Sequence, residues 1–183
     1  SLLKKMDPNL CIVVGGPAVS YLPKKIMEEN PQVDIVVSGD GESRMKAIFK
    51  NGATPSALSQ IPEITYRNDG HEIISTEGSF KEDVTKIPSP YQNNVINLND
   101  GKGHTVFIES FRGCPFECQY CIWGDFDNEM SLFPIDQILK DIEIIYNNPN
   151  IRMVYFTDAN IFFIDEIHRL SSVVEEYLYS AME

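Results

Sequence analysis

The chain has 183 residues, of which 43% are hydrophobic, and a formal net charge of −12 from 27 acidic and 15 basic residues. This length suits one medium domain or two small ones, and no apolar run approaches the length of a membrane span. The acidic balance, without a Lys/Arg-rich stretch, argues against a nucleic-acid partner. The start of the chain shows no secretory signal pattern, so we expect a cytoplasmic protein without a membrane partner.

The first part of the chain alternates strand and helix patterns. Continuous apolar runs at 10–14 and 33–37 predict buried parallel strands, each followed by a glycine-containing turn. One helix is predicted over 20–29, with Ser20 as its N-cap. Another is predicted over 42–50 and ends at the C-terminal signal Asn51-Gly52. Two strand–helix units are too few for a complete doubly wound sheet. We therefore expect residues 1–60 to be the C-terminal part of a Rossmann-like domain.

Residues 61–104 are predicted to connect two domains. Strand-like segments at 64–67 and 72–75 flank Asn68-Asp-Gly70, which predicts a β-hairpin. The following Pro88-Ser-Pro-Tyr91 enforces an extended path. We expect this segment to be an ordered linker without chemistry of its own, since only some loops carry function.

From residue 105 the strand–helix pattern resumes. Strands are predicted at 105–110 and 153–156, and a helix after Asp165. The helix between the two strands starts at Pro134, and its apolar face is formed by Ile135, Ile138, Leu139, Ile142 and Ile145. A complete eight-unit barrel takes about 250 residues. We therefore expect residues 105–183 to be the N-terminal part of a barrel, and the chain to be a fragment at both ends.

Three of the four cysteines lie in one short loop directly after the strand at 105–110. Cys114, Cys118 and Cys121 form a C-x3-C-x2-C run, and three thiolates so close together can hold a small inorganic centre. In a 4Fe–4S cube they leave one iron open to a small-molecule ligand, whereas an electron carrier closes all four positions with cysteine. The spacing therefore predicts a cluster with an open iron.

Zinc and disulfide alternatives fit the spacing less well. Structural zinc takes four ligands, and none of the three histidines, His71, His104 and His168, has a suitable spacing to the loop. Cys11 lies in an apolar run and is predicted to be a small core residue. A disulfide within the loop would close only a tiny ring. A non-enzymatic iron–sulfur or zinc module stays an alternative, and it requires a fourth protein ligand.

Residues 109–121, Glu-Ser-Phe-Arg-Gly-Cys-Pro-Phe-Glu-Cys-Gln-Tyr-Cys, resemble the cluster loop of the radical S-adenosylmethionine (SAM) enzymes. The flanking Arg112-Gly113 and Pro115-Phe116 are similar to the cobalamin-binding branch in particular. Residues 13–20 and 34–42 look like the last third of the cobalamin-binding domain of that branch. The resemblance implies an α/β fold: the end of a Rossmann-like domain joined to the first βα units of a partial TIM-type barrel.

The resemblance also implies a chemistry. Cys114, Cys118 and Cys121 would hold the 4Fe–4S cluster, and SAM would chelate the open iron. Reductive cleavage of SAM then gives methionine and a 5′-deoxyadenosyl radical, with the electron supplied by an external donor of the flavodoxin or ferredoxin type. The substrate would be a small molecule, with cobalamin as a further cofactor and methyl transfer or another radical reaction as the outcome.

Four further cofactor-binding residues follow from the resemblance. Tyr120 and Asp158 would contact SAM, and Gly15 and Gly16 would approach the nucleotide tail of cobalamin. From the residues alone, Tyr120 can equally pack the loop, and the other three are ordinary turn formers after strands. A tRNA-modifying methylthiotransferase is the enzymatic alternative, and it would need a basic RNA-binding surface.

Overall fold

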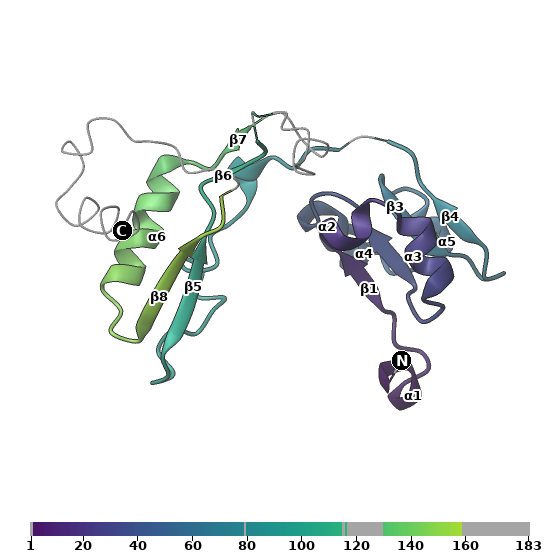
Figure 1. Cartoon of the computed structure of the whole chain (residues 1–183), viewed down its shortest axis with the longest axis horizontal. Coiled ribbons are helices and arrows are strands. Elements are labelled where there is room, and N and C mark those ends of the chain that lie inside the picture. Colours follow the sequence, from purple (N-terminus) through teal and green to yellow (C-terminus); the bar gives the residue numbers. More distant parts are fainter. Residues whose placement is uncertain (1, 79, 115, 117–129, 159–183) are drawn as a thin grey trace. The chain divides into compact units, whose positions relative to one another are not determined.

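The computed structural model describes residues 2–78, 80–114, 116 and 130–158 (Figure 1). The chain divides into two compact units, residues 1–82 and 83–183. Each unit has its own sheet and its own hydrophobic core.

The first unit contains a four-stranded sheet. Its strands are β1 (Val13–Gly15), β2 (Ile35–Val37), β3 (Ile64–Arg67) and β4 (Ile73–Ser75), in that spatial order. β1 and β2 are parallel, and the hairpin β3–β4 adds to β2 in antiparallel orientation. The hairpin forms as predicted, but it is hydrogen-bonded to the first sheet. For this reason the boundary between the units falls after residue 82, and not at the expected residue 60.

Four short helices cover the sheet: α2 (Pro17–Ser20), α3 (Pro23–Glu29), α4 (Glu42–Asn51) and α5 (Pro55–Leu58). A further short helix, α1 (Leu2–Met6), precedes β1 and buries none of its residues. The single helix predicted over 20–29 is wrong, because Pro23 starts a new helix, where its fixed φ and missing N–H are tolerated. Ser20 ends α2 instead of capping a helix. The predicted end of α4 is confirmed at Gly52, which has a φ of 81°.

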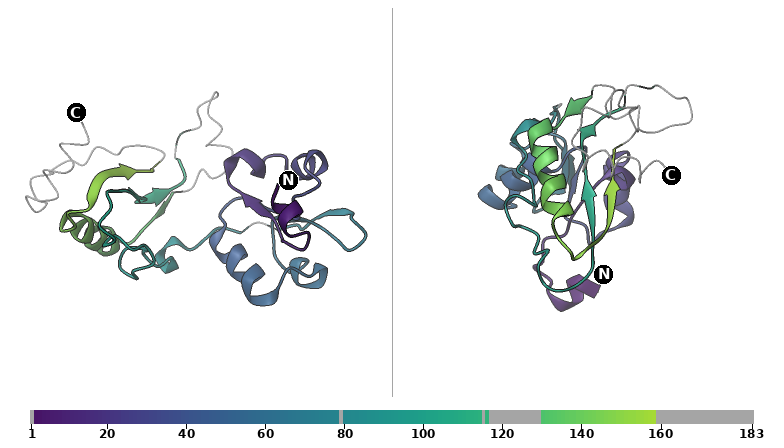
Figure 2. Two further views of the ribbon diagram at one scale, coloured as in Figure 1. Left: turned by 90° about the horizontal axis from the view of Figure 1, so that it is seen from below. Right: turned by 90° about the vertical axis from the view of Figure 1, so that its left-hand side faces the viewer.

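The central strand β2 explains why helices lie on both faces of this sheet. Alternate residues of a strand point to opposite faces. Ile35 and Val37 belong to the core cluster that includes Ile48 of α4, whereas Val36 packs with Met27 of α3. Figure 2 shows the resulting three layers, with α2 and α3 on one side of the sheet and α4 and α5 on the other.

The second unit is built on two parallel strands, β5 (His104–Ile108) and β8 (Ile151–Phe156). Helix α6 (Ile135–Tyr146) connects them and lies along the pair (Figure 1). An apolar core lies between α6 and the strand pair, and its buried residues are Tyr91, Leu98, Val106, Ile108, Ile138 and Ile145. On the exposed face the rings of Phe107 and Tyr155 stack at 5.7 Å. This strand–helix–strand arrangement confirms the predicted βα pattern up to the end of β8, and the helix predicted after Asp165 lies outside the described residues.

Three details of this unit differ from the sequence pattern. A short antiparallel pair, β6 (Phe111–Arg112) and β7 (Ser131–Leu132), was not predicted, and neither was the single turn η1 (Val84–Lys86). Ile135 was expected on the buried face of α6, yet it is 66% exposed. It is the first residue of the helix, one turn before the buried stripe begins at Ile138.

Candidate metal and cofactor site

Cys114 is the one predicted cluster ligand within the described residues. Cys118, Cys121 and Tyr120 lie outside them. The chain turns at Gly113, which has a φ of 89°, and Cys114 follows with only 7% of its surface exposed. Its Sγ lies 3.9 Å from the Phe116 carbonyl oxygen. The first thiol of the motif is therefore buried where the loop leaves β6.

Both ends of the cysteine loop meet at one place. Phe111 pairs with Leu132 and Arg112 with Ser131, so the loop leaves and returns through the β6–β7 ladder. The Phe133 N–H donates to the Ser110 carbonyl oxygen at 3.0 Å. Ser110 itself comes two residues after β5 ends at Ile108. The loop thus stands at the carboxyl end of a parallel strand, where the active sites of βα barrels collect.

Asp158 reaches the start of this loop from the end of β8. Its Oδ1 accepts hydrogen bonds from the N–H of Ser110 at 2.7 Å and of Phe111 at 3.1 Å. Its Oδ2 accepts from the Ser110 hydroxyl at 2.6 Å. The structure therefore brings Asp158 beside the cysteine loop, with both carboxylate oxygens engaged by the backbone and side chain of that loop's entry.

An ion pair across the same turn was not singled out from the sequence. The Arg112 guanidinium donates two hydrogen bonds of 2.9 Å each to the carboxylate of Glu109 and lies 5.6 Å from the centroid of the Phe133 ring. Arginine makes such paired contacts because its planar fork matches a carboxylate. The only signal in the sequence is opposite charge three residues apart.

Gly15 and Gly16 end β1 in the first unit, and each has a backbone reason to be glycine. A Cβ on Gly15 would lie 3.2 Å from the Val37 carbonyl oxygen, and Gly16 has a φ of 89°. These constraints hold without any ligand, so they support the turn interpretation of the two glycines.

A second glycine loop lies next to the first, because β2 is parallel to β1. The Ser20 hydroxyl links the two loops, donating to the Gly16 carbonyl oxygen at 2.9 Å and accepting from the Gly39 N–H at 3.3 Å. A Cβ built on Gly16, Gly39 or Gly41 would meet no atom within 4 Å. Backbone at the carboxyl edge of the two strands is therefore accessible at close range, which fits the approach of a flat, bulky group such as cobalamin.

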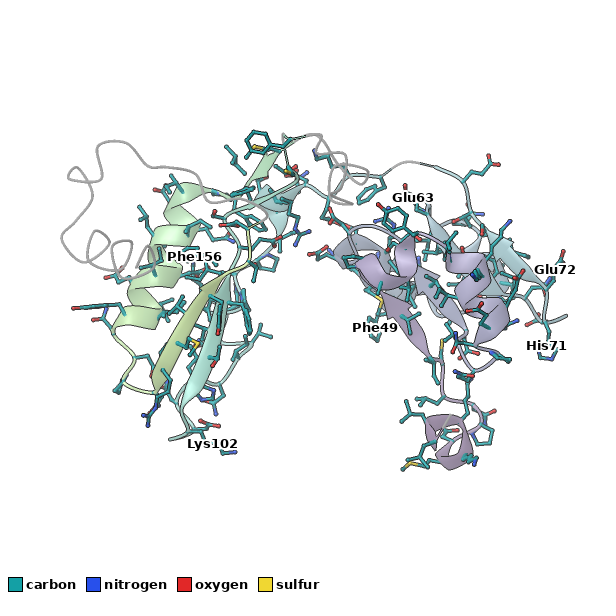
Figure 3. All side chains as sticks on the ribbon, viewed as in Figure 1. Phe49, Glu63, His71, Glu72, Lys102 and Phe156 are labelled. Carbon is teal, nitrogen blue, oxygen red and sulfur yellow. The ribbon has the colours of Figure 1, made fainter. Side chains whose placement is uncertain are left out.

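The described histidines and Cys11 do not form a second metal site. His71 lies at the tip of the β3–β4 hairpin (Figure 3), and a ring nitrogen of His104 is 2.7 Å from Asp100. Cys11 is exposed, so the core position predicted for it is wrong. Partial burial of the thiol and the charge of Asp34 raise the pKa of Cys11. Among the described residues, no three His, Cys, Asp or Glu side chains gather as metal ligands would.

Comparisons with known proteins agree with these features. An uncharacterized methyltransferase of Pyrococcus horikoshii is 25% identical over 161 residues, which cover 86% of this chain and 35% of that protein. The cobalamin-dependent radical SAM methyltransferase TokK of Streptomyces tokunonensis is 24% identical over 170 residues, 87% of this chain and 24% of that protein. The resemblance to cobalamin-binding radical SAM enzymes is confirmed.

The fold of this chain is also that of part of a solved radical SAM enzyme. The structure of the cobalamin-dependent SAM radical enzyme OxsB, with aqua-cobalamin and SAM bound, superposes with a TM-score of 0.64 at 18% identity. The superposition covers 96% of this chain and 24% of that one. The expected α/β architecture, a Rossmann-like part and a partial barrel, is thereby confirmed. The chain spans 35% and 24% of the lengths of the two relatives above.

A different family matches the end of the chain. The model of the Holliday junction DNA helicase RuvB P-loop domain matches residues 149–183, of which the structure describes 149–158. The full sequence contains no G-x-x-x-x-G-K-S/T run, the phosphate-binding signature of P-loop proteins. This match does not reach the cysteine loop.

In the part of the chain that the structure describes, no helix is long and apolar enough to span a bilayer.

Proposed function

We propose that this chain is part of a radical SAM enzyme that holds a 4Fe–4S cluster through Cys114, Cys118 and Cys121. The observation that carries the proposal is the position of the cysteine loop, which starts at the carboxyl end of β5 in a parallel strand–helix–strand unit. The burial of Cys114 at the start of the loop supports it, because a ligand thiolate is kept from bulk water there. An open iron would then bind SAM.

The bound cluster would supply the electron for reductive cleavage of SAM, and that chemistry belongs to the cofactor. The protein's part is to position the reactants and to exclude water. The β6–β7 ladder holds the two ends of the loop together, and the Glu109–Arg112 pair stiffens its entry. We propose Tyr120 as a neighbour of bound SAM, whereas both carboxylate oxygens of Asp158 are already engaged by Ser110 and Phe111 at the entry of the loop.

We also propose a cobalamin site at the glycine loops of the first unit. In this assignment the first unit, residues 1–82, is the C-terminal part of a cobalamin-binding domain, residues 83–104 connect, and residues 105–183 begin the barrel. The open space around the backbone of Gly16, Gly39 and Gly41, next to Gly15, supports the site. The helix predicted after Asp165 belongs to the barrel in this assignment. The P-loop family model matches residues 149–183, so it gives a competing assignment for the same segment.

The substrate we propose is a small molecule, and the reaction methyl transfer or another radical outcome. A flavodoxin- or ferredoxin-type donor would deliver the electron, and a cytoplasmic location would protect an oxygen-sensitive cluster. The net charge of −12 disfavours the tRNA-modifying methylthiotransferase alternative, because RNA is itself a polyanion.

Anaerobic reconstitution with iron and sulfide tests the proposal. We expect about four irons per chain and an EPR signal of the reduced sample that changes when SAM is added. Cys118→Ala should lose the cluster, whereas Cys11→Ala, at an exposed position of the other unit, should keep it. One zinc and no iron per chain would contradict the proposal, and a cluster insensitive to SAM would favour the non-enzymatic module.

A further inference from the structure

We propose that Asp158 is a positioning residue, which fastens the entry of the cluster loop to the end of β8 through its contacts with Ser110. The inference rests on the proposed function of the cysteine loop. It assigns the Asp158 carboxylate to the protein's own loop, and not to a direct contact with SAM. A residue that positions the loop and a residue that contacts SAM predict different effects of Asp158 substitutions in the cofactor-free protein.

The contacts of Asp158 begin where the strand ladder ends. β5 and β8 pair up to Ile108 and Phe156, and the Thr157 N–H still donates to the Ile108 carbonyl oxygen at 2.9 Å. Beyond this point the chain leaves β5 to form β6, so main-chain pairing with β8 stops. The Asp158 side chain continues the link between the two chain segments by accepting hydrogen bonds from the N–H groups of Ser110 and Phe111.

Ser110 is the residue at which three segments meet. Its N–H and hydroxyl are bound by Asp158 from the end of β8, and its carbonyl oxygen accepts from Phe133 at the exit of the cysteine loop. Cys114 follows four residues later along the chain. Any displacement of Ser110 would therefore shift both ends of the loop relative to the barrel strands.

A carboxylate suits this position because it can accept all three hydrogen bonds, and charged acceptors form the stronger ones. An asparagine can keep the geometry: its oxygen accepts the two N–H groups, and its amide donates to the Ser110 hydroxyl, which can turn to accept. Alanine keeps none of them. A positioning role thus predicts that Asp158→Asn rescues what Asp158→Ala loses, whereas a role that needs the negative charge does not.

The test uses the full chain and begins without metal. Amide hydrogen exchange is measured at Ser110 and Phe111 in wild type, Asp158→Ala, Asp158→Asn, Ser110→Ala and the control Glu143→Ala. Glu143 is an exposed carboxylate on α6. We expect both amides to exchange at least about tenfold faster in Asp158→Ala. The change should be smaller in Ser110→Ala and Asp158→Asn, and absent in the control.

Iron content and the EPR spectrum after reconstitution, both before SAM is added, give the second readout. We expect Asp158→Ala to bind less iron, or to give an altered EPR signal, and Asp158→Asn to recover the wild-type values. Unchanged exchange at Ser110 and Phe111 in Asp158→Ala would overturn the proposal. So would an Asp158→Asn variant that loses only its response to SAM, because that result assigns the charge to a SAM contact.

Failure of the proposed function is distinguishable from failure of this inference. If the wild-type chain takes up no iron, the proposed function fails, and the exchange of the two amides in the metal-free protein still decides whether Asp158 fastens the loop. A thermal unfolding curve for each variant identifies a general loss of structure. If Asp158→Ala loses its structure in general, the wild type is compared with Asp158→Asn and Ser110→Ala, because these two variants remove fewer hydrogen bonds.

Discussion

The Tyr91 hydroxyl makes two hydrogen bonds to the backbone of one residue: it donates to the Phe107 carbonyl oxygen at 2.6 Å and accepts from the Phe107 N–H at 3.0 Å. The Ile108 carbonyl oxygen accepts a hydrogen bond from the Thr157 N–H, directly after β8, so the backbone groups of Ile108 face β8. Because the backbone groups of successive strand residues point to opposite edges, those of Phe107 face the other edge of β5. Tyr91 occupies that edge. An unpaired strand edge is a site for unwanted pairing with other chains, and this contact blocks it in the middle of β5.

Tyr91→Phe should destabilise the second unit. The change removes one hydroxyl and leaves two backbone groups of Phe107 without this partner, at an expected cost of about 1–3 kcal/mol in the free energy of unfolding. Urea unfolding followed by circular dichroism measures the loss. Tyr155→Phe is the matched control, since that ring is half exposed. Equal stability of the two variants would contradict the structural role of Tyr91.

The same tyrosine should make stability fall at alkaline pH. Burial, and to a smaller extent the charge of Asp141, raises the pKa of Tyr91 above its ordinary value of 10.0. Below about pH 10 both the folded and unfolded states keep the proton, and the stabilisation is complete. Above it the unfolded state loses the proton first, so stability declines as the pH rises toward the folded-state pKa. Unfolding curves between pH 8 and about 11 should show this decline in wild type and a weaker one in Tyr91→Phe.

Asp141 should be important for stability although it is a charged residue on a helix. Only 6% of it is exposed, and its Oδ1 accepts from the Ser89 hydroxyl at 2.5 Å and the Gln92 amide at 2.8 Å. Asp141→Ala removes the acceptor of the Ser89 hydroxyl and one of the two acceptors of the Gln92 amide, which also donates to the Gln137 carbonyl oxygen. The loss should cost about 1–3 kcal/mol. Glu143→Ala, on the exposed face of α6, should change stability by less than about 0.5 kcal/mol. Thermal unfolding of the two variants side by side checks the difference.

Gly16→Ala should destabilise the first unit through the backbone alone. Gly16 has a φ of 89° and a ψ of 172°, a region of backbone conformation essentially restricted to glycine, and a residue with a Cβ there costs about 1–3 kcal/mol. Gly41→Ala is the control, because Gly41 has a φ of −101° and open space around it. If cobalamin approaches both loops closely, both variants should weaken its binding, measured by absorbance titration. Weakened binding in neither would argue against a cobalamin site there.

Several features of this protein are determined by local sequence alone. The apolar run at β2 predicts a strand buried on both faces, and the Asn68-Asp-Gly70 turn predicts the hairpin, because each signal depends on neighbouring residues and backbone preference. The cysteine spacing likewise predicts a cluster loop from local sequence, because all three predicted ligands come from eight consecutive positions.

Tertiary structure alone decided what the charged and polar side chains contact. Arg44 is 2% exposed and donates to Glu63 and to the Pro62 carbonyl oxygen, a burial that no local pattern indicated. Tyr91, expected in a linker without chemistry, protects an edge of β5. Asp158 meets Ser110 across 48 positions of the chain. Such contacts depend on how strands and helices are brought together, and a buried polar group is stable only where the fold supplies its partner.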